Sequence, residues 1–448
     1  MQKKIYNANK YGAVPDGKTL CTSAIQSAID EAAANGGGII TFDKGNYLTG
    51  TVFIKSNIDF EISEGVALLG VVDEASYPEF WNRVAGVEML WPVGVLTVMS
   101  QHNVRIFGGG TIDGQGEYWW HKYWGGDRRG GMRKIYDAQG LRSVVDYDCK
   151  RPRNIVVINS TDIEIENLLI KRSGFWNVHI CYSYNVKIAD LKITENYGPS
   201  TDGIDIDSSC NVTVESCHIE CSDDNICIKS GRDADGLRVG RPCENIVVRN
   251  CIIGKGDGVT VGSETSGGMR NIEFSGIKMS GTKNGIRLKS AKTRGGIIEN
   301  IRFSDFDITD VPIIFNFQLN WNPEYSYCKI PETWQGEIPA HWQTLCRQVL
   351  PPERGIPEFK NIAISNIRAH CISEKCSSTL FKVEGSPQKP IKSVSFKNIV
   401  AEASTAGFIK YACGWSFDNA VFNIGDETKI NLEQCCDIKL DSVRYGRP

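Results

Sequence analysis

The sequence lacks three features that would each assign it to a particular class of protein. No uninterrupted apolar run approaches the roughly 18 residues that a membrane-spanning helix requires, so no membrane span is predicted. Neither sign of charge dominates, because 50 Lys and Arg residues face 53 Asp and Glu residues. The net charge of −3 argues against nucleic acid as a partner. The 16 cysteines include no Cys-x-x-Cys pair, so their spacing provides no zinc ligand set.

The chain is also longer than typical disulfide-rich proteins, and its sequence shows no secretion signal. Disulfide-dense proteins are small chains that cannot bury a core, whereas 448 residues can bury a large one. A disulfide framework is therefore not expected. No apolar segment of the signal-peptide type follows Met1.

The sequence does contain a repeated phrase, in which Asn or Asp precedes a β-branched residue and a short apolar–polar alternation. The phrase begins at Asn103, Asp162, Asn185, Asn211, Asn245, Asn271, Asn300 and Asn361. From its second to its seventh copy the intervals are 23, 26, 34, 26 and 29 residues. A period in the twenties that is built of strands rather than helices predicts a solenoid.

The spacing within the copies predicts an all-β fold, specifically a parallel β-helix. The sixth residue after the Asn is apolar in five successive coils, and the core of a parallel β-helix requires such an apolar column. The column contains Leu191, Cys217, Cys251, Ile277 and Phe306. We interpret its two cysteines as small buried hydrophobic residues. A large β-sandwich is the alternative, but its hairpins would not produce a fixed period in the twenties.

One helix is predicted near the N-terminus, over residues 23–34. Ser23 and Gln26 have the spacing of a capping box, and the three glycines at 36–38 end the helix. We expect this helix to cap the solenoid, with residues 1–60 forming the cap and the first coils. No second strong helix is expected before the segment near position 340.

A solenoid grows by adding coils to one core, so residues 1–448 are predicted to form a single domain and a monomer. Two segments interrupt the repeat. Residues 231–242 form a polar loop, and the inserted segment 318–357 is rich in aromatic residues, including Trp321 and Tyr325. Loops on a regular scaffold often bind ligands, but aromatic side chains serve packing equally well. Both roles therefore stay open for 318–357.

Three carboxylates are predicted to lie close together on one face of the solenoid. Asp202 precedes Asp223 by 21 residues, which is close to one coil, and Asp224 follows directly. Clustered carboxylates repel one another and raise at least one pKa, a cost that is tolerated mainly where acid and base roles are needed together. A calcium site is the alternative. Cations suited to an anionic substrate follow in the next coils: Lys229, Arg232, Arg287 and Lys289.

A series of phrases runs through the chain in a fixed order. The central ones are Ser-Thr-Asp-Gly-Ile-Asp-Ile at 200–206, Ser-Asp-Asp-Asn at 222–225, Val-Gly-Ser-Glu at 261–264 and Ile-Arg-Leu-Lys at 286–289. This series resembles the polygalacturonase family, family 28 of the glycoside hydrolases, over roughly positions 5–310. The stretch Lys-Ser-Gly-Arg-Asp-Ala-Asp-Gly at 229–236 resembles its bacterial exo-acting branch in particular.

The resemblance implies a right-handed parallel β-helix that hydrolyses α-1,4-linked galacturonic acid in pectic polysaccharide or oligosaccharide, with inversion and without metal or cofactor. By position, Asp223 resembles the general acid that protonates the leaving oxygen. Asp202 and Asp224 resemble the pair that activates the attacking water. Arg287 and Lys289 resemble the residues that hold a substrate carboxylate, which needs a charged partner when it is desolvated.

Lys229, Arg232, Asp257 and His179 are further substrate-binding candidates. Lys229 and Arg232 supply positive charge, and His179 ends the matched phrase Ser-Gly-Phe-Trp-Asn-Val-His. Asp257 marks a departure from the family, whose members usually carry a His in a Gly-His-Gly phrase here. The stretch 254–258 reads Gly-Lys-Gly-Asp-Gly instead, with Asp257 or Gly256 in place of the His.

The missing His leaves the substrate less certain than the fold. Enzymes that act on rhamnogalacturonan also depart from the polygalacturonase pattern, so a rhamnogalacturonan-directed hydrolase is one alternative. A calcium-dependent pectate or rhamnogalacturonan lyase is a second, and a non-catalytic sugar-binding β-helix of the adhesin type is a third. Exo action is predicted from the phrase at 229–236 and from the segment 318–357, which is suited to close one end of a groove. We expect a periplasmic or secreted protein, although a cytoplasmic location stays open.

Overall fold

The computed structural model describes residues 3–373 and 376–446. They form a mostly β fold of parallel strands stacked in successive coils, as in a parallel β-helix, which confirms the predicted fold class. The described residues divide into two compact units. Unit 1 comprises the described part of Met1–Val84, Glu88–Gln139 and Val145–Asp223; unit 2 comprises Ala85–Val87, Gly140–Val144 and the described part of Asp224–Pro448. The single domain stays a prediction, and its outer bounds, 1 and 448, lie outside the described residues.

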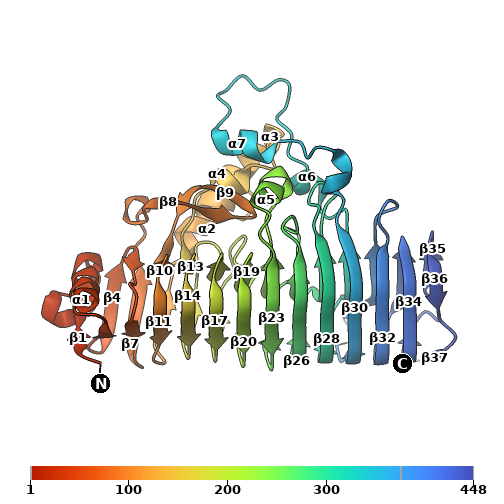
Figure 1. Ribbon diagram of the computed structural model, residues 1–448, viewed down its shortest axis with the longest axis horizontal. Coiled ribbons are helices and arrows are strands. Elements are labelled where there is room, and N and C mark those ends of the chain that lie inside the picture. Colours follow the sequence, from red (N-terminus) through yellow and green to blue (C-terminus); the bar gives the residue numbers. More distant parts are fainter. Residues whose placement is uncertain (1–2, 374–375, 447–448) are drawn as a thin grey trace. The chain divides into compact units, whose positions relative to one another are not determined.

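Unit 1 contains three stacks of parallel strands (Figure 1). The β13 stack consists of β5 (Val52–Phe53), β10 (Gly94–Met99), β13 (Arg153–Ile158), β16 (Val178–Cys181) and β19 (Ile204–Asp207). The second consists of β1 (Ile5–Asn7), β3 (Gly38–Thr41), β6 (Ile58–Glu61), β11 (His102–Phe107), β14 (Thr161–Glu166), β17 (Tyr184–Ala189) and β20 (Cys210–Glu215). The third consists of β2 (Asp16–Leu20), β4 (Gly45–Thr49), β7 (Val66–Gly70), β12 (Thr111–Asp113), β15 (Leu169–Lys171), β18 (Lys192–Thr194) and β21 (His218–Ile219). A separate hairpin pairs β8 (Glu79–Val84) with β9 (Val87–Pro92); its turn and the first residue of β9, Ala85–Val87, are assigned to unit 2 and its other residues to unit 1.

Unit 2 is built in the same way, with longer strands. Its β27 stack consists of β22 (Ile226–Lys229), β25 (Val259–Val261), β27 (Asn284–Lys289), β29 (Ile313–Gln318), β31 (Thr379–Glu384), β33 (Thr405–Lys410) and β35 (Asn431–Glu433). The other strands are β23 (Cys243–Arg249), β24 (Ile252–Ile253), β26 (Met269–Ser280), β28 (Ile297–Thr309), β30 (Glu358–His370), β32 (Ile391–Ala403), β34 (Ala412–Ile424), β36 (Cys436–Lys439) and β37 (Val443–Gly446). In Figure 1, β26, β28, β30 and β32 are adjacent parallel arrows.

The repeated Asn and Asp residues bend each coil. All eight have φ between 54° and 58°, the left-handed region that Asn and Asp tolerate better than other non-glycine residues. Their side chains form ladders between coils. In unit 2 the Nδ2 atom of Asn271 donates to Oδ1 of Asn245 at 3.1 Å, and Asn300 donates to Asn271 at 3.4 Å. The repeat thus supplies both the bend and a side-chain hydrogen bond to the next coil.

The predicted apolar column is buried as expected. Its five residues are at most 2% exposed, and Ile277 pairs with Phe306 in the parallel register. The interpretation of Cys217 and Cys251 as buried hydrophobic residues is confirmed.

The cysteines outside this column form closer contacts than the sequence predicts. Cys413 and Cys436, which pair in register on β34 and β36, form a disulfide. The sulfur atoms of Cys328 and Cys346 lie 2.8 Å apart, and those of Cys371 and Cys376 lie 3.1 Å apart. The Cys413–Cys436 pair depends on the coil register, and none of the three contacts has a spacing signature in the sequence.

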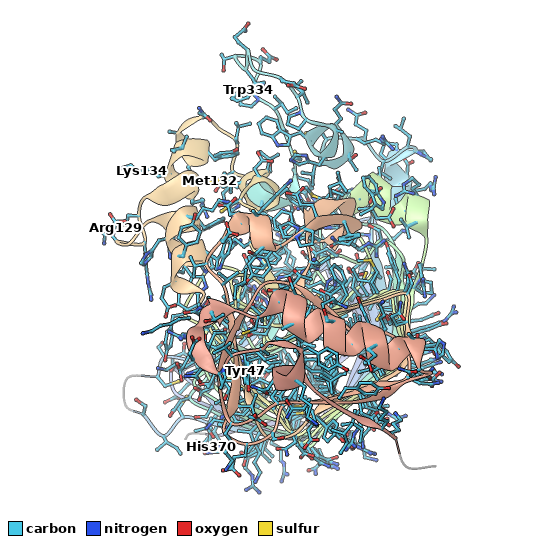
Figure 2. The ribbon with its side chains drawn as sticks, turned by 90° about the vertical axis from the view of Figure 1, so that its left-hand side faces the viewer. Tyr47, Arg129, Met132, Lys134, Trp334 and His370 are labelled. Carbon is cyan, nitrogen blue, oxygen red and sulfur yellow. A yellow bond between two sulfur atoms is a disulfide. The ribbon has the colours of Figure 1, made fainter. Side chains whose placement is uncertain are left out.

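The N-terminal helix is present, but the predicted capping box is wrong. Helix α1 spans Thr22–Ala34, and its N-cap is Cys21, which makes no side-chain capping bond. The Gln26 side chain instead makes two hydrogen bonds with the backbone of Phe53 on β5, at 2.9 and 3.0 Å. In the same part of unit 1, Tyr47 (Figure 2) is fully buried and donates its hydroxyl to the carbonyl of Asp43.

No second strong helix is expected before position 340, but several short helices that the sequence did not predict lie there. Each of the missed helices has eight residues or fewer and lacks a side-chain N-cap bond or a long apolar period, which leaves little signal in the sequence. They are α2 (Glu117–Trp124), α3 (Gly131–Ala138), α4 (Val145–Asp148) and α5 (Asp233–Val239). The side chains of Arg129 and Lys134, before and within α3, are exposed and point outward in Figure 2.

The inserted segment 318–357 contains two short helices, α6 (Pro323–Ser326) and α7 (Ala340–Leu345). The described 3₁₀ turns are η1 (Ala8–Tyr11), η2 (Glu74–Ser76) and η3 (Pro352–Gly355). Among the described residues, no helix has the length and apolar character that crossing a membrane requires.

Replacement of Asn271 tests the role of the ladder. We expect Asn271→Ala to lower stability by about 1–2 kcal/mol, because alanine is strained at φ 57° and makes no ladder bond. Asn271→Gly loses the same bonds but tolerates the bend, so its loss should be smaller. Thermal unfolding followed by circular dichroism measures the order wild type, glycine variant, alanine variant. An alanine variant as stable as the wild type would contradict this account.

Candidate active site

Asp202 lies just before β19 in unit 1, where the neighbouring coil fixes its backbone. The backbone N–H and the side-chain amide of Asn177 both donate to the carbonyl oxygen of Asp202, each at 2.9 Å. The Thr201 hydroxyl lies 3.1 Å from the hydroxyl of Ser222, which immediately precedes Asp223. Small polar residues thus join the turn that carries Asp202 to the turn that carries Asp223.

The two acids of unit 1 lie close together, as their one-coil spacing predicts. A carboxylate oxygen of Asp202 and one of Asp223 are within 4.8 Å of each other. Asp202 is 3% exposed, whereas Asp223 is only partly buried. The more accessible of the two acids is therefore Asp223.

In unit 2 the carboxylate of Asp224 is enclosed by donors from β25 and β27. The Nζ atom of Lys289 lies 2.6 Å from Oδ2, and Nη1 of Arg287 lies 3.1 Å from Oδ1. The hydroxyl of Thr260, which is in register with Arg287, donates to Oδ1 at 2.7 Å. Asp224, at 1% side-chain exposure, is therefore a buried anion held by two cations.

These contacts fix the protonation states of the pair. Burial alone would raise the pKa of Asp224, but the charges of Lys289 and then Arg287 hold that pKa well below its usual range. Burial would lower the pKa of Lys289, but the Asp224 carboxylate raises it above its ordinary value. Near neutral pH, Asp224 is ionised and Lys289 is protonated.

Trp321 covers the two cations of this cluster. Its ring centroid lies 4.4 Å from the Nζ atom of Lys289 and 5.7 Å from the guanidinium carbon of Arg287, which is cation–π geometry. Trp321 belongs to the inserted segment 318–357, for which packing and binding roles were both open. The segment contributes at least one side chain to the surroundings of Asp224.

Comparison with known proteins assigns the chain to a family. Residues 90–324, more than half of the chain, match the family model described as glycosyl hydrolases family 28. The chain belongs to this family.

Individual relatives agree with that assignment. The chain is 28% identical to a probable polygalacturonase of Vitis vinifera over 394 residues, which cover 84% of this chain and 76% of the relative. It is 28% identical to an endo-polygalacturonase of Pectobacterium parmentieri over 308 residues, covering 66% and 72%. A family 28 exopolygalacturonase of Yersinia enterocolitica shares the fold, with a TM-score of 0.80, 20% identity, and coverage of 100% of this chain and 79% of that chain.

Asp257, which stands near the place where a family 28 histidine is expected, joins the charge cluster of unit 2. Its Oδ2 atom accepts from Nη1 of Arg287 at 2.7 Å, and its Oδ1 atom lies 2.7 Å from Nζ of Lys283. Arg287 therefore contacts two carboxylates, Asp224 and Asp257. The Asp257 carboxylate thus pairs with both Arg287 and Lys283, whichever of Gly256 and Asp257 stands in place of the family His.

Lys229 lies in the same unit and pairs with an acid that had no assigned role. Its Nζ atom is 3.4 Å from Oε2 of Glu264, and both side chains are about 5% exposed or less. Glu264 is the last residue of the matched phrase at 261–264, which is the signal that could have identified it. Burial would raise the pKa of Glu264, but Lys229 and other cations lower it to about 2.

Arg232, another predicted substrate-binding residue, is fully buried and contacts the inserted segment. Its Nη2 atom donates to the carbonyls of Tyr325 and Ser326 at 2.7 and 3.2 Å, and its guanidinium lies over the Tyr325 ring. Its Nε atom pairs with Asp233 at 3.2 Å. These contacts give Arg232 a part in holding 318–357 in place within unit 2.

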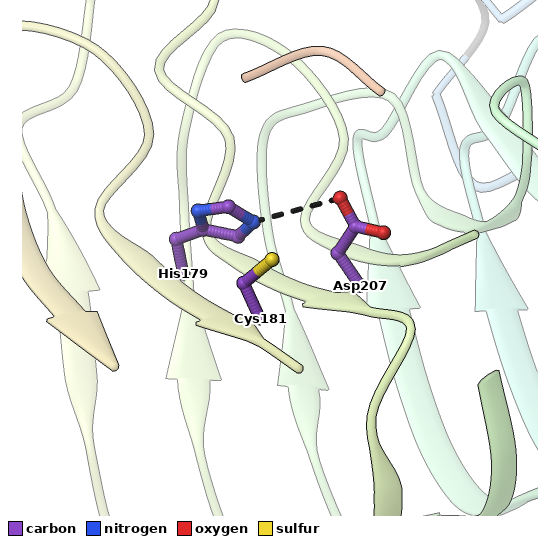
Figure 3. A group of neighbouring side chains, drawn as sticks. All are labelled: His179, Cys181 and Asp207. Carbon is purple, nitrogen blue, oxygen red and sulfur yellow. Dashed lines mark ion pairs between the residues drawn. The ribbon is translucent and has the colours of Figure 1, made fainter. Parts of the chain in front are cut away.

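His179 is fully buried in unit 1, beside Cys181 and Asp207 (Figure 3). Its Nε2 atom lies 3.8 Å from Oδ2 of Asp207. A guanidinium nitrogen of Arg153 lies 2.6 Å from Nδ1 of His179. Because a guanidinium only donates, Nδ1 is the acceptor and the ring proton is on Nε2.

The His179, Cys181 and Asp207 side chains are close enough to form a ligand set, with their ligand atoms within 4.8 Å of one another. However, the guanidinium of Arg83 pairs with Asp207 at 3.0 Å, and that of Arg153 is bound to His179. A metal ion at this point would be repelled by two positive charges, so the residues present do not favour one.

The Lys229–Glu264 pair predicts a specific pH dependence of stability. The folded-state pKa of Glu264 is lowered from 4.5 to about 2, so its ionisation stabilises the protein above pH 4.5, and this contribution is lost as pH falls toward 2. At pH 7, Glu264→Gln removes a buried carboxylate that pairs with the buried Lys229 ammonium group and should cost about 3–5 kcal/mol. The stability difference from wild type should narrow below pH 4.5.

Thermal unfolding of wild type and variant across pH 2.5–7 measures this difference. Glu273→Gln is the matched control, because Glu273 forms an exposed pair with Arg302 at 4.0 Å and should change stability by less than about 1 kcal/mol. A difference for Glu264→Gln that stays constant with pH would contradict the assignment.

Proposed function

We propose that this family 28 hydrolase cleaves α-linked galacturonic acid in pectic polysaccharide or oligosaccharide, releasing it from a chain end with inversion. The observation that carries the proposal is the cluster of Asp224, Lys289 and Arg287 in unit 2. Every sugar of a galacturonan carries a carboxylate, and a desolvated carboxylate needs ammonium or guanidinium partners. A site in which an acid such as Asp224 lies next to such cations suits an acidic sugar better than a neutral one.

Asp223 is the proposed general acid. Asp224 is held ionised by its two cations and therefore has no proton to donate near neutral pH. Asp223 directly precedes Asp224 in the chain and is more exposed than Asp224. Its carboxyl group can therefore reach the glycosidic oxygen of a sugar that binds from solvent. Asp202 and Asp224 would then accept hydrogen bonds from the attacking water and orient it.

Inversion rests on the family resemblance rather than on spacing. Inverting glycosidases commonly separate their two carboxyl groups by roughly 6.5–9.5 Å and retaining enzymes by about 5 Å. The nearest oxygens of Asp202 and Asp223 are within 4.8 Å, so distance alone does not favour inversion. The configuration of the first product decides the question.

A rhamnogalacturonan-directed hydrolase is the second candidate function. Asp257 favours it, because an anion at this position changes the charge that a neighbouring sugar would meet. The lyase alternative has less support, since family 28 is a family of hydrolases and the cations near Asp224 are engaged by carboxylates.

Product analysis tests the reaction type. We expect oligogalacturonides, incubated with chelator present, to yield new reducing ends without an ultraviolet-absorbing unsaturated product. Proton NMR of the first product should show the β-anomer, as inversion of an α-linkage requires. An unsaturated product would support the lyase instead, and turnover of rhamnogalacturonan I oligosaccharides alone would support the second candidate.

Replacement of the proposed acid tests the assignment of Asp223. Asp223→Asn should lower kcat by about 10²–10⁴-fold with little change in stability, because an amide cannot protonate the leaving oxygen. Asp190→Asn is the matched control: Asp190 is an exposed turn residue with φ 54°, and its variant should keep wild-type turnover. If the wild type already turns over no pectic oligosaccharide, the sugar-binding adhesin becomes the better account.

A further inference from the structure

The β8–β9 hairpin covers outward-facing residues of the β13 stack in unit 1. Along β16 and β19, Val178, Ile180, Ile204 and Ile206 face the core, and the residues between them face outward. The outward residues include His179 and Asp207, which are both fully buried. The hairpin contacts Asp207 through Arg83, and it is joined to His179 through Arg153.

Arg83, near the end of β8, makes the first contact. Its Nη1 atom donates to Oδ1 of Asp207 at 3.0 Å and to the hydroxyl of Ser208 at 2.7 Å. Its guanidinium lies 4.6 Å from the ring centroid of Tyr182, whose hydroxyl donates to Glu88 on β9. Both strands of the hairpin are thus bound to the segments at the ends of β16 and β19.

Arg153, at the start of β13, makes the second contact from the opposite side. Its Nη2 atom donates to Oδ1 of Asn82 at 2.8 Å and to the carbonyl of Pro92 at 3.2 Å. The same guanidinium reaches Nδ1 of His179. Arg153 therefore links the hairpin to the outward-facing imidazole on β16.

This part of unit 1 has no open strand face on which a sugar could bind. Every residue of β13, β16 and β19 is buried, including the outward Val156 and Ile158. In unit 2, by contrast, the outward Lys382 on β31 is exposed and Phe408 on β33 is half-buried. A polysaccharide that continued past Asp202 across β19, β16 and β13 would have to displace the hairpin.

We infer that the β8–β9 hairpin is a wall that ends the sugar-binding face beside Asp202 and so restricts cleavage to chain ends. The inference rests on the proposed function and names the element that would make the enzyme exo-acting. The Arg83–Asp207 ion pair locks the wall. Both side chains are fully buried. A buried ion pair adds little net stability, but it fixes the position of the hairpin, because moving the hairpin away would leave each charge buried without its counterion.

The test removes both charges of the lock together in one variant and the hairpin itself in another. In the double variant Arg83→Met with Asp207→Asn, both partners become neutral; a second variant replaces residues 80–91 with a short Gly-Ser linker. Trp81→Ser is the matched control, because Trp81 is 63% exposed on the same hairpin and makes no part of the lock. Thermal unfolding confirms that each protein is folded before its products are compared.

The substrate is a decagalacturonide labelled at its reducing end, and early products are separated by length. Wild type and Trp81→Ser should release one short product at a time from a chain end. In the opened variants, the fraction of substrate molecules that are first cut inside the chain should be about tenfold higher or more. A second measurement needs only the wild type. It uses two oligomers, which carry a bulky amide at opposite ends of the chain. Turnover of one of them should fall about tenfold or more.

Two results overturn the wall: wild type that produces intermediates of many lengths from the start, or folded opened variants that still cut only at chain ends. Equal turnover of both blocked oligomers by wild type overturns it as well. Failure of the proposed function gives a different result, because wild type would then release no reducing ends from any galacturonide.

Discussion

The bend at the repeated asparagine is the constraint on which the rest of the structure depends. Because Asn and Asp accept φ near 55°, the coils that carry the repeat turn at the same point, and their strands meet those of the next coil in parallel register. Residues about one period apart in sequence then become neighbours in space. The proximity of Asp202 to Asp223 in unit 1 and of Thr260 to Arg287 in unit 2 follows from this register.

Buried charge is the second constraint, and it decides which acid can do chemistry. Asp207 is paired with Arg83, Asp224 with Lys289, Glu264 with Lys229 and Asp233 with Arg294. Each of these carboxylates has its pKa lowered by its partner against the effect of burial, so none of them holds a proton near neutral pH. This leaves proton donation to an acid outside the four pairs, which agrees with the role proposed for Asp223.

The regular part of the fold could be predicted from the sequence, because its signal is local and repeated. The Asn phrase predicts the parallel coils, and the residue six positions later predicts the buried column. The one-coil spacing predicts the acid cluster and the cations that follow it, and the matched phrases suggest the role of each residue. The partners of buried groups could not be predicted in this way, since Arg83 and Asp207 are 124 residues apart and Cys413 meets Cys436 only through the coil register. The helices α2 to α5 were missed because short helices depend on tertiary packing.

The two segments that distinguish this chain from a bare solenoid differ in how visible they are in the sequence. Segment 318–357 interrupts the repeat and is rich in aromatic residues, so it draws attention at once. The β8–β9 hairpin precedes the regular copies and leaves its trace on another strand. In β13 the residues Ile155 to Ile158 are all apolar, so both faces of the strand need cover, although one face of a solenoid strand should meet solvent. Val156 and Ile158 pack with Cys181, Met99 and Tyr182 beneath that cover. In the proposed wall, the unbroken apolar run of β13 is therefore the trace that the covering hairpin leaves in the sequence.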